Sequence, residues 1–141
     1  MEIDCGGWIS VLFHKLKKRV NADVQRLGLT GIQSRVIHYI LIKSAEEPVY
    51  QRDVESAFGV SRSTVTGMLK QMEKEGLIQR VSVASDARLK SLVPTQKAVH
   101  LDAQVGERLQ HAEQCLTRGL TGAQIAAFKE AAAQMSANLD D

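Results

Sequence analysis

Apolar residues recur along most of the chain at the spacing of amphipathic helices, in stretches separated by glycines or short polar breaks. In residues 60–76 they share one arc of roughly 100° on a helical wheel, which is the width of a buried stripe. These positions are Val65, Met68, Leu69 and Met72. The opposite face is polar, with Ser61 placed to cap the start of the helix and Gly76 placed to end it. The pattern therefore predicts an amphipathic helix with one face in a core.

Two longer helices are predicted in the N-terminal part of the chain. Apolar positions at four-residue steps predict a long helix over residues 7–27, which Gly28 ends. Thr30 opens a second helix, because its spacing to Gln33 fits a capping box. The nearly continuous apolar run over residues 36–42 predicts that this second helix is largely buried.

Two more long helices are predicted at the C-terminal end. Thr95 begins the first, Gly119 breaks the chain, and Thr121 begins the second with capping-box spacing. The apolar stripes are Leu101, Val105, Leu109, Ala112 and Leu116 in the first helix and Ile125, Phe128, Ala132, Met135 and Leu139 in the second. These faces exceed what a small core needs, so we expect residues 7–27 and 95–139 to form a homodimerisation region.

A short helical segment precedes the helix of residues 60–76. Residues 51–58 form that segment and Gly59 follows, which gives the helix, tight turn and helix of a helix-turn-helix motif. In this motif the second helix lies in the major groove of DNA and the first crosses the backbone. Gln51 and Arg52 are therefore candidate phosphate contacts, the alternative for Arg52 being plain exposure. The polar face of the second helix carries Arg62, Ser63, Thr66, Lys70 and Lys74 as candidate groove contacts.

The pattern changes to β character after this helix. Leu77–Val83 and Leu89–Val93 are predicted as short strands on either side of a polar turn at residues 84–87. Two strands joined by a turn after such a helix make a wing. We interpret Asp86 as stabilising the wing through a local charge-assisted bond, and Arg88 as a contact to the adjacent minor groove.

The fold class that follows is mainly α with a small β-wing. We expect a single domain over residues 1–141, with a winged helix-turn-helix core over residues 30–94. The formal net charge is only +2, but residues 61–90 hold six Lys or Arg and three acids, whereas residues 95–141 hold four and six. A basic middle favours contact with a polyanion.

Composition and missing motifs exclude several classes of function. Aromatic residues, at 4%, are too few for single-strand stacking platforms. The chain has no phosphate-binding glycine loop, nucleophile elbow or His-Glu-x-x-His string, so we expect neither an enzyme nor a cofactor. Its first ten residues carry acids where a signal peptide carries cations, and no apolar run approaches the ~20 residues of a membrane span. We therefore expect a cytoplasmic protein without a membrane partner.

Three strings of the chain carry a family resemblance through their order and spacing. They are LTGIQSRVIHYIL, VSRSTVTGMLKQMEKEGLIQR and SDARLKSLVPT. Together they resemble the MarR family of bacterial winged helix-turn-helix regulators. The family pattern places an Asp-x-Arg ten residues after the glycine that ends the recognition helix, and a Thr nine residues beyond that Asp. Asp86, Arg88 and Thr95 satisfy both spacings counted from Gly76.

The resemblance implies a homodimer that binds a pseudo-palindromic operator in double-stranded DNA. Such a dimer usually represses transcription until a small molecule or an oxidant alters the spacing of its two reading heads. The predicted DNA-binding residues are Gln51, Arg52, Ser61, Arg62, Ser63, Thr64, Thr66 and Lys70 at the major groove or its phosphates, and Arg88 at the minor groove. The chain departs from the pattern at Gly67, where many members carry an Arg or another long polar residue, and also at Pro94 and Ala98.

Members of this family often bind phenolic or other small aromatic compounds between the dimer helices and the winged core. By that resemblance the candidate effector-pocket residues are Trp8, Phe13, His14 and His38. The alternative is that the two aromatic side chains belong to the core and that the histidines are satisfied or exposed.

The two cysteines, Cys5 and Cys115, are too few for a disulfide framework. They loosely resemble the reactive and resolving cysteines of the family's peroxide-sensing branch, although Cys5 precedes two glycines and is expected ahead of the first helix. A metal site is not expected, because His100 and His111 lie eleven residues apart, about 16 Å along a helix. The alternatives that stay open are incidental cysteines, a thiol-based oxidant-sensing regulator, and a winged helix that binds protein without DNA.

Overall fold

The structure is a computed structural model that describes residues 2–83 and 86–140, and these residues form six helices and one two-stranded antiparallel sheet. The elements are α1 (Cys5–Arg26), α2 (Gly31–Ser44), α3 (Gln51–Phe58), α4 (Arg62–Lys74), β1 (Ile78–Val83), β2 (Asp86–Pro94), α5 (Gln96–Thr117) and α6 (Gly122–Leu139). This order confirms the predicted fold class, a mainly α protein with a β-wing. Within the described ranges no helix is long and apolar enough to span a membrane.

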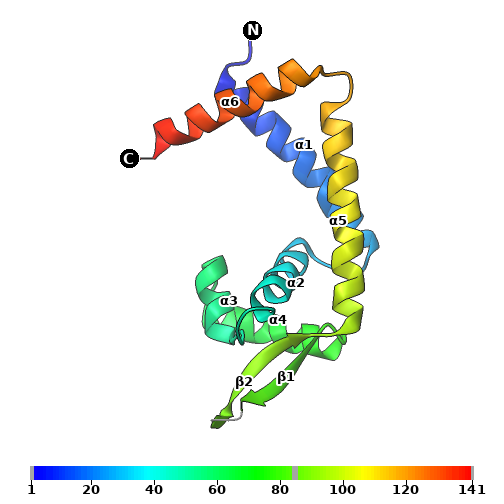
Figure 1. The fold of residues 1–141 in the computed structure, drawn as a ribbon, viewed down its shortest axis with the longest axis vertical. Helices are drawn as coiled ribbons and strands as arrows, with labels where there is room; N and C mark the ends of the chain where they lie inside the picture. Colours follow the sequence, from blue (N-terminus) through cyan, green and yellow to red (C-terminus); the bar gives the residue numbers. More distant parts are fainter. Residues whose placement is uncertain (1, 84–85, 141) are drawn as a thin grey trace.

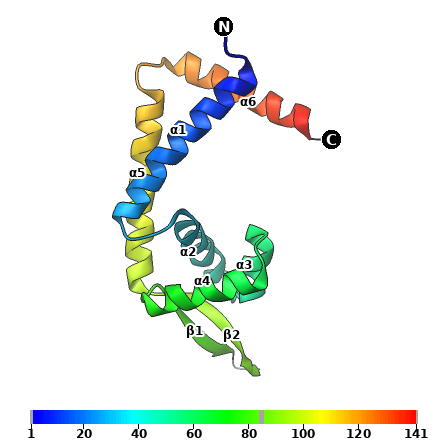
Figure 2. The same cartoon turned by 180° about the vertical axis from the view of Figure 1, so that it is seen from behind.

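The elements fall into two parts, which Figures 1 and 2 show from opposite sides. Helices α2, α3 and α4 pack together with the β1–β2 hairpin, and we call this part the winged-helix lobe. Helices α1, α5 and α6 extend away from it, and we call this part the helical arm. Helix α1 packs against α5, and α6 turns back across the N-terminal end of α1. The two chain termini therefore lie at the far end of the arm.

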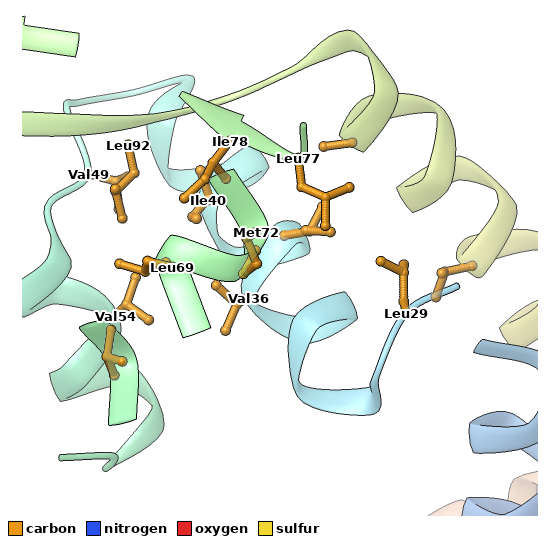
Figure 3. Packing of buried hydrophobic residues seen from close by; sticks show 14 of the residues in the cluster. Leu29, Val36, Ile40, Val49, Val54, Leu69, Met72, Leu77, Ile78 and Leu92 are labelled. Atoms are coloured by element: carbon orange, nitrogen blue, oxygen red, sulfur yellow. The ribbon is translucent and has the colours of Figure 1, made fainter. Parts of the chain in front are cut away.

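The hydrophobic core lies mainly in the winged-helix lobe (Figure 3). One face of α4 contributes Val65, Leu69 and Met72, all of which are fully buried. They pack in one cluster with residues of α2, of both strands and of the α2–α3 connection. The predicted apolar stripe is thus confirmed, with Met68 half-buried at its edge. Because one side of α4 is fixed in this core, its other side faces outward.

Helix ends follow the signals in the sequence. The Ser61 hydroxyl accepts a hydrogen bond from the backbone N of Thr64 at 3.3 Å, which caps α4. Gly59, between α3 and α4, has φ 61, and Gly76, after α4, has φ 75. An L side chain is strained in this left-handed region, so glycine suits both turns. These two glycines fix where α4 can begin and end.

Three of the elements have bounds that differ from the prediction. Helix α1 begins at Cys5 rather than Gly7, because the Asp4 carboxylate accepts a hydrogen bond from the backbone N of Gly7 at 2.7 Å and caps the helix earlier. Strand β1 begins at Ile78 rather than Leu77. Strand β2 spans Asp86–Pro94 rather than Leu89–Val93, because its pairing with β1 runs along both strands to Asp86. Of the predicted turn at residues 84–87, residues 86 and 87 belong to β2, and residues 84 and 85 lie outside the described residues.

Helix α2 is less buried than its apolar run predicts. Val36, Ile37 and Ile40 are fully buried, but His38 and Ile42 are exposed. The reason is the turn of the helix, which points residues two apart to different sides. One exposed position, His38, faces the helical arm.

Candidate nucleic-acid interface

The outward face of α4 is polar from its first turn. Arg62, Ser63, Lys70 and Lys74 are exposed there, while Thr66 is half-buried. The first residues of α3 lie beside this face. The wing extends from the lobe on the side away from the arm (Figure 1). Cations and small hydroxyls on an outward helix can contact phosphates and base edges.

Two of the predicted contact residues bind each other. The Gln51 amide nitrogen donates to the Thr66 hydroxyl at 2.7 Å and lies 3.4 Å from the Arg62 carbonyl oxygen. The Thr66 hydroxyl in turn donates to the same carbonyl at 2.8 Å. We call this set of bonds the Gln51–Thr66 bracket, and it joins the start of α3 to the first turns of α4.

Other predicted residues are also held by neighbours. The Ser61 hydroxyl, which caps α4, lies 2.9 Å from the Thr64 hydroxyl. The Arg52 guanidinium lies over the Tyr50 ring, 5.2 Å from its centroid. Among the cationic residues predicted on these two helices, Arg62 and Lys70 are exposed.

The wing carries a local pair near its tip. The Asp86 carboxylate accepts a hydrogen bond from the backbone N of Arg88 at 2.9 Å, and the same oxygen lies 3.7 Å from Arg88 Nε. The Arg88 side chain is 95% exposed. Asp86 thus orders the wing backbone through a local bond, whereas the contact of the exposed Arg88 with the minor groove stays a prediction.

Gly67 lies in the middle of the outward face of α4. A Cβ built at this position meets no atom within 4 Å, and its φ is not in the left-handed region. Neither packing nor backbone conformation therefore requires glycine here. The outward face simply has a gap between Ser63 and Lys70, where a longer side chain would fit.

The end of α4 is bonded to the start of α5. The Thr95 hydroxyl donates to the Gly76 carbonyl at 2.6 Å and accepts from the backbone N of Ala98 at 3.2 Å. Lys97 Nζ donates to the Glu75 carbonyl at 2.8 Å. We call these bonds the α4–α5 latch. They connect the outward-facing helix of the lobe directly to α5, the helix of the arm that packs against α1.

A crevice of about 390 Å³ lies between the lobe and the arm. It is lined by Val20, Asn21 and Val24 of α1, by Gly31, Ser34, Arg35 and His38 of α2, and by Asp102, Val105, Gly106 and Leu109 of α5. His38 Nδ1 lies 3.1 Å from an Asp102 carboxylate oxygen, which bridges α2 to α5 at the crevice.

The structure does not bring the four predicted effector residues together. His38 lines the crevice, whereas Phe13 lines a separate apolar hollow among α1, α5 and α6. Trp8 is exposed near the start of α1, and the exposed His14 has Nδ1 2.7 Å from the Ser10 carbonyl. The physical reason is that these three residues lie on the half of α1 remote from the lobe.

Sequence reasoning missed the residues that do line the crevice beside His38. Asp102 and Arg35 are the charged ones. A usable signal exists in α5, where Asp102, Val105 and Leu109 follow one another at steps of three and four residues and so share one face. An acid within an apolar stripe of this kind indicates a polar contact across the interface.

The cysteines have different surroundings, and neither forms a disulfide. Cys5 is exposed in the first turn of α1. Cys115 is half-buried in α5, where the Arg118 guanidinium donates to its sulfur at 3.4 Å and His111 Nε2 lies 3.7 Å from it. The basic side chains of Arg118 and His111 therefore lie beside Cys115. The family resemblance suggested this cysteine only as a possible resolving partner.

Comparison with known proteins gives consistent matches. A family model described as MarR family matches residues 27–89. MarR from Oenococcus oeni PSU-1 is 28% identical with a TM-score of 0.64, over 94% of this chain and 98% of that one. MepR, a transcription regulator of the Staphylococcus aureus multidrug efflux pump MepA, is 20% identical with a TM-score of 0.87, over 97% and 99%. A complex of S. aureus MepR with DNA gives 20% identity and a TM-score of 0.71, over 98% of both chains.

Proposed function

We propose that this chain, a member of the MarR family of winged-helix regulators, is a homodimeric repressor that binds specific sequences of double-stranded DNA. The observation that carries the proposal is the outward face of α4, where Arg62 and Lys70 are exposed, as is Arg88 on the wing. In a winged helix this face enters the major groove and the wing reaches the adjacent minor groove. The fold shared with MepR, which has been crystallised with DNA, supports this assignment.

The exposed surface of the arm supports a dimer. The single chain exposes 10116 Å², roughly 2,900 Å² more than a compact monomer of its mass. Helix α6 has no buried residue, and its apolar stripe includes Phe128, which is 61% exposed. Surfaces of this size and character are typical of obligate homodimers. A two-fold dimer would present two copies of α4 to two half-sites of a pseudo-palindromic operator.

The experiment that tests the proposal measures the salt dependence of DNA binding. Binding to DNA from upstream of the protein's own gene is followed by fluorescence anisotropy between 50 and 200 mM salt. If each protomer neutralises three phosphates, we expect the affinity to fall by about 10³-fold over this range, because bound cations release counterions from DNA. A shuffled duplex is the control. Salt-insensitive or absent binding would favour the alternative of a winged helix that binds protein instead.

The crevice between lobe and arm supports release by a small-molecule effector. Its walls are largely apolar, while Arg35 and His38 supply cationic or hydrogen-bonding groups. We propose that it takes a small aromatic carboxylate or phenol, since the apolar walls suit the ring and Arg35 suits an anionic substituent. Such a ligand would compete with Asp102 for His38 and so loosen the contact between α2 and α5.

Release of DNA by 4-hydroxybenzoate tests this part of the proposal. Arg35→Ala is expected to raise the concentration needed for release by about 10- to 150-fold, the loss of one hydrogen bond to a charged group. Phe13→Ala, in the separate hollow, is the matched control and should leave that concentration unchanged. An equal effect of both variants would contradict the crevice as the site. If peroxide rather than the aromatic acid releases DNA, and Cys115→Ser abolishes that release, the oxidant-sensing alternative is favoured.

A further inference from the structure

The hydrogen bonds of the Gln51–Thr66 bracket use the groups that a DNA contact would need. The single proton of the Thr66 hydroxyl is donated to the Arg62 carbonyl, and the hydroxyl oxygen accepts from Gln51. The amide nitrogen of Gln51 faces both of these oxygens. Donating a hydrogen bond to a base from either side chain would therefore require breaking a bond that already exists.

Burial separates these two residues from their neighbours. Gln51 and Thr66 are half-buried, whereas Arg62 and Lys70 on the same surface are exposed. Helix α3 has only eight residues, and a helix this short is not stable in isolation. The direction of α3 relative to α4 therefore depends on the contacts between the two helices. The bracket is one of these contacts and joins the first residue of α3 to the first turns of α4.

We infer that Gln51 and Thr66 are positioning residues that hold α4 at its angle to α3, and that neither reads a base. This inference rests on the proposed function, because it concerns how α4 is presented to DNA. The bracket acts before DNA is bound, by raising the fraction of molecules with α4 in the competent orientation. If the fraction of molecules with α4 in the competent orientation falls, the apparent affinity for every DNA sequence falls by the same factor.

A direct base contact behaves differently from a positioning residue. Removing a base contact relaxes the preference at one base pair and leaves the others unchanged. The two roles are therefore separated by measuring affinity for the operator and for a set of single-base-pair variants. The variants needed are Thr66→Val, which keeps the shape of the side chain but removes the hydroxyl, Thr66→Ser, which keeps the hydroxyl, and Gln51→Ala.

We expect Thr66→Val and Gln51→Ala each to weaken binding by about 2- to 10-fold on every DNA variant, the effect of one net hydrogen bond. Thr66→Ser should stay within about twofold of the unsubstituted protein. The double variant Thr66→Val with Gln51→Ala should bind about as well as either single variant, because both remove the same bracket. Circular dichroism of each variant checks that it remains folded.

Relaxed preference at a single base pair in Thr66→Val or Gln51→Ala would overturn the inference, and so would unchanged affinity in both. Failure of Thr66→Ser to retain binding would also contradict it, because the hydroxyl would then not be the group that matters. DNA binding by the unsubstituted protein distinguishes failure of this inference from failure of the proposed function. If it shows no salt-sensitive DNA binding, the proposed function fails and the inference fails with it.

Discussion

Replacing Ile40 by alanine is expected to lower the free energy of unfolding by about 2–5 kcal/mol, the range for a fully buried Ile that leaves a cavity. Ile40 lies on α2 in the cluster that also holds Leu69 of α4 and Ile78 of β1 (Figure 3). Its side chain is 0% exposed. The change is measured by urea unfolding at a fixed protein concentration, because a dimer's stability depends on concentration.

Ile42 on the same helix provides the matched control. It lies two residues further along and is 53% exposed. Ile42→Ala is therefore expected to change the free energy of unfolding by no more than about 0.5 kcal/mol. If the two substitutions destabilise the protein equally, the side of α2 that faces the core has been assigned wrongly.

Replacing Arg62 by alanine is expected to weaken operator binding by about 5- to 150-fold, which corresponds to about 1–3 kcal/mol for one good base contact. Arg62 is the first residue of α4 and is exposed on the outward face. A guanidinium there can bond two acceptors on the edge of a guanine at once. The preference at one base pair should therefore relax together with the loss of affinity.

Arg26→Ala is the control for charge alone. Arg26 is the last residue of α1, is 79% exposed and lies 3.5 Å from an Asp23 carboxylate oxygen on the same helix. Its removal takes away one positive charge but should leave both affinity and specificity nearly unchanged at 150 mM salt, where distant charges are screened. If both variants lose affinity equally and without change of specificity, Arg62 contributes general charge and does not read a base.

Much of the fold was predictable because its determinants are local. A helix cap such as Ser61 or Thr30 is read from residues three positions apart, and the structure contains both caps. The turn glycines and the apolar stripe of α4 are equally local. The wrong prediction for the start of α1 has a local cause too. The two glycines Gly6 and Gly7 favour a later start, so the prediction overlooks the cap that Asp4 provides.

The functional surface was less predictable because it depends on how helices cross. The bond between Gln51 and Thr66 joins residues fifteen positions apart, and the pair of His38 and Asp102 spans sixty-four. Periodicity places each of these residues on a face but does not say which faces meet. The sequence could therefore place a polar face on α4 without showing which of its side chains are already bonded within the protein.

The α4–α5 latch has a mechanical consequence. Thr95 and Lys97 bond the residues just after α4 to the start of α5, so we expect those two helix ends to move together. In a dimer built on the arms, a small rotation of one α5 against the other would swing the attached α4 through a larger arc. The distance between the two copies of α4 would then depend on the angle between the two arms.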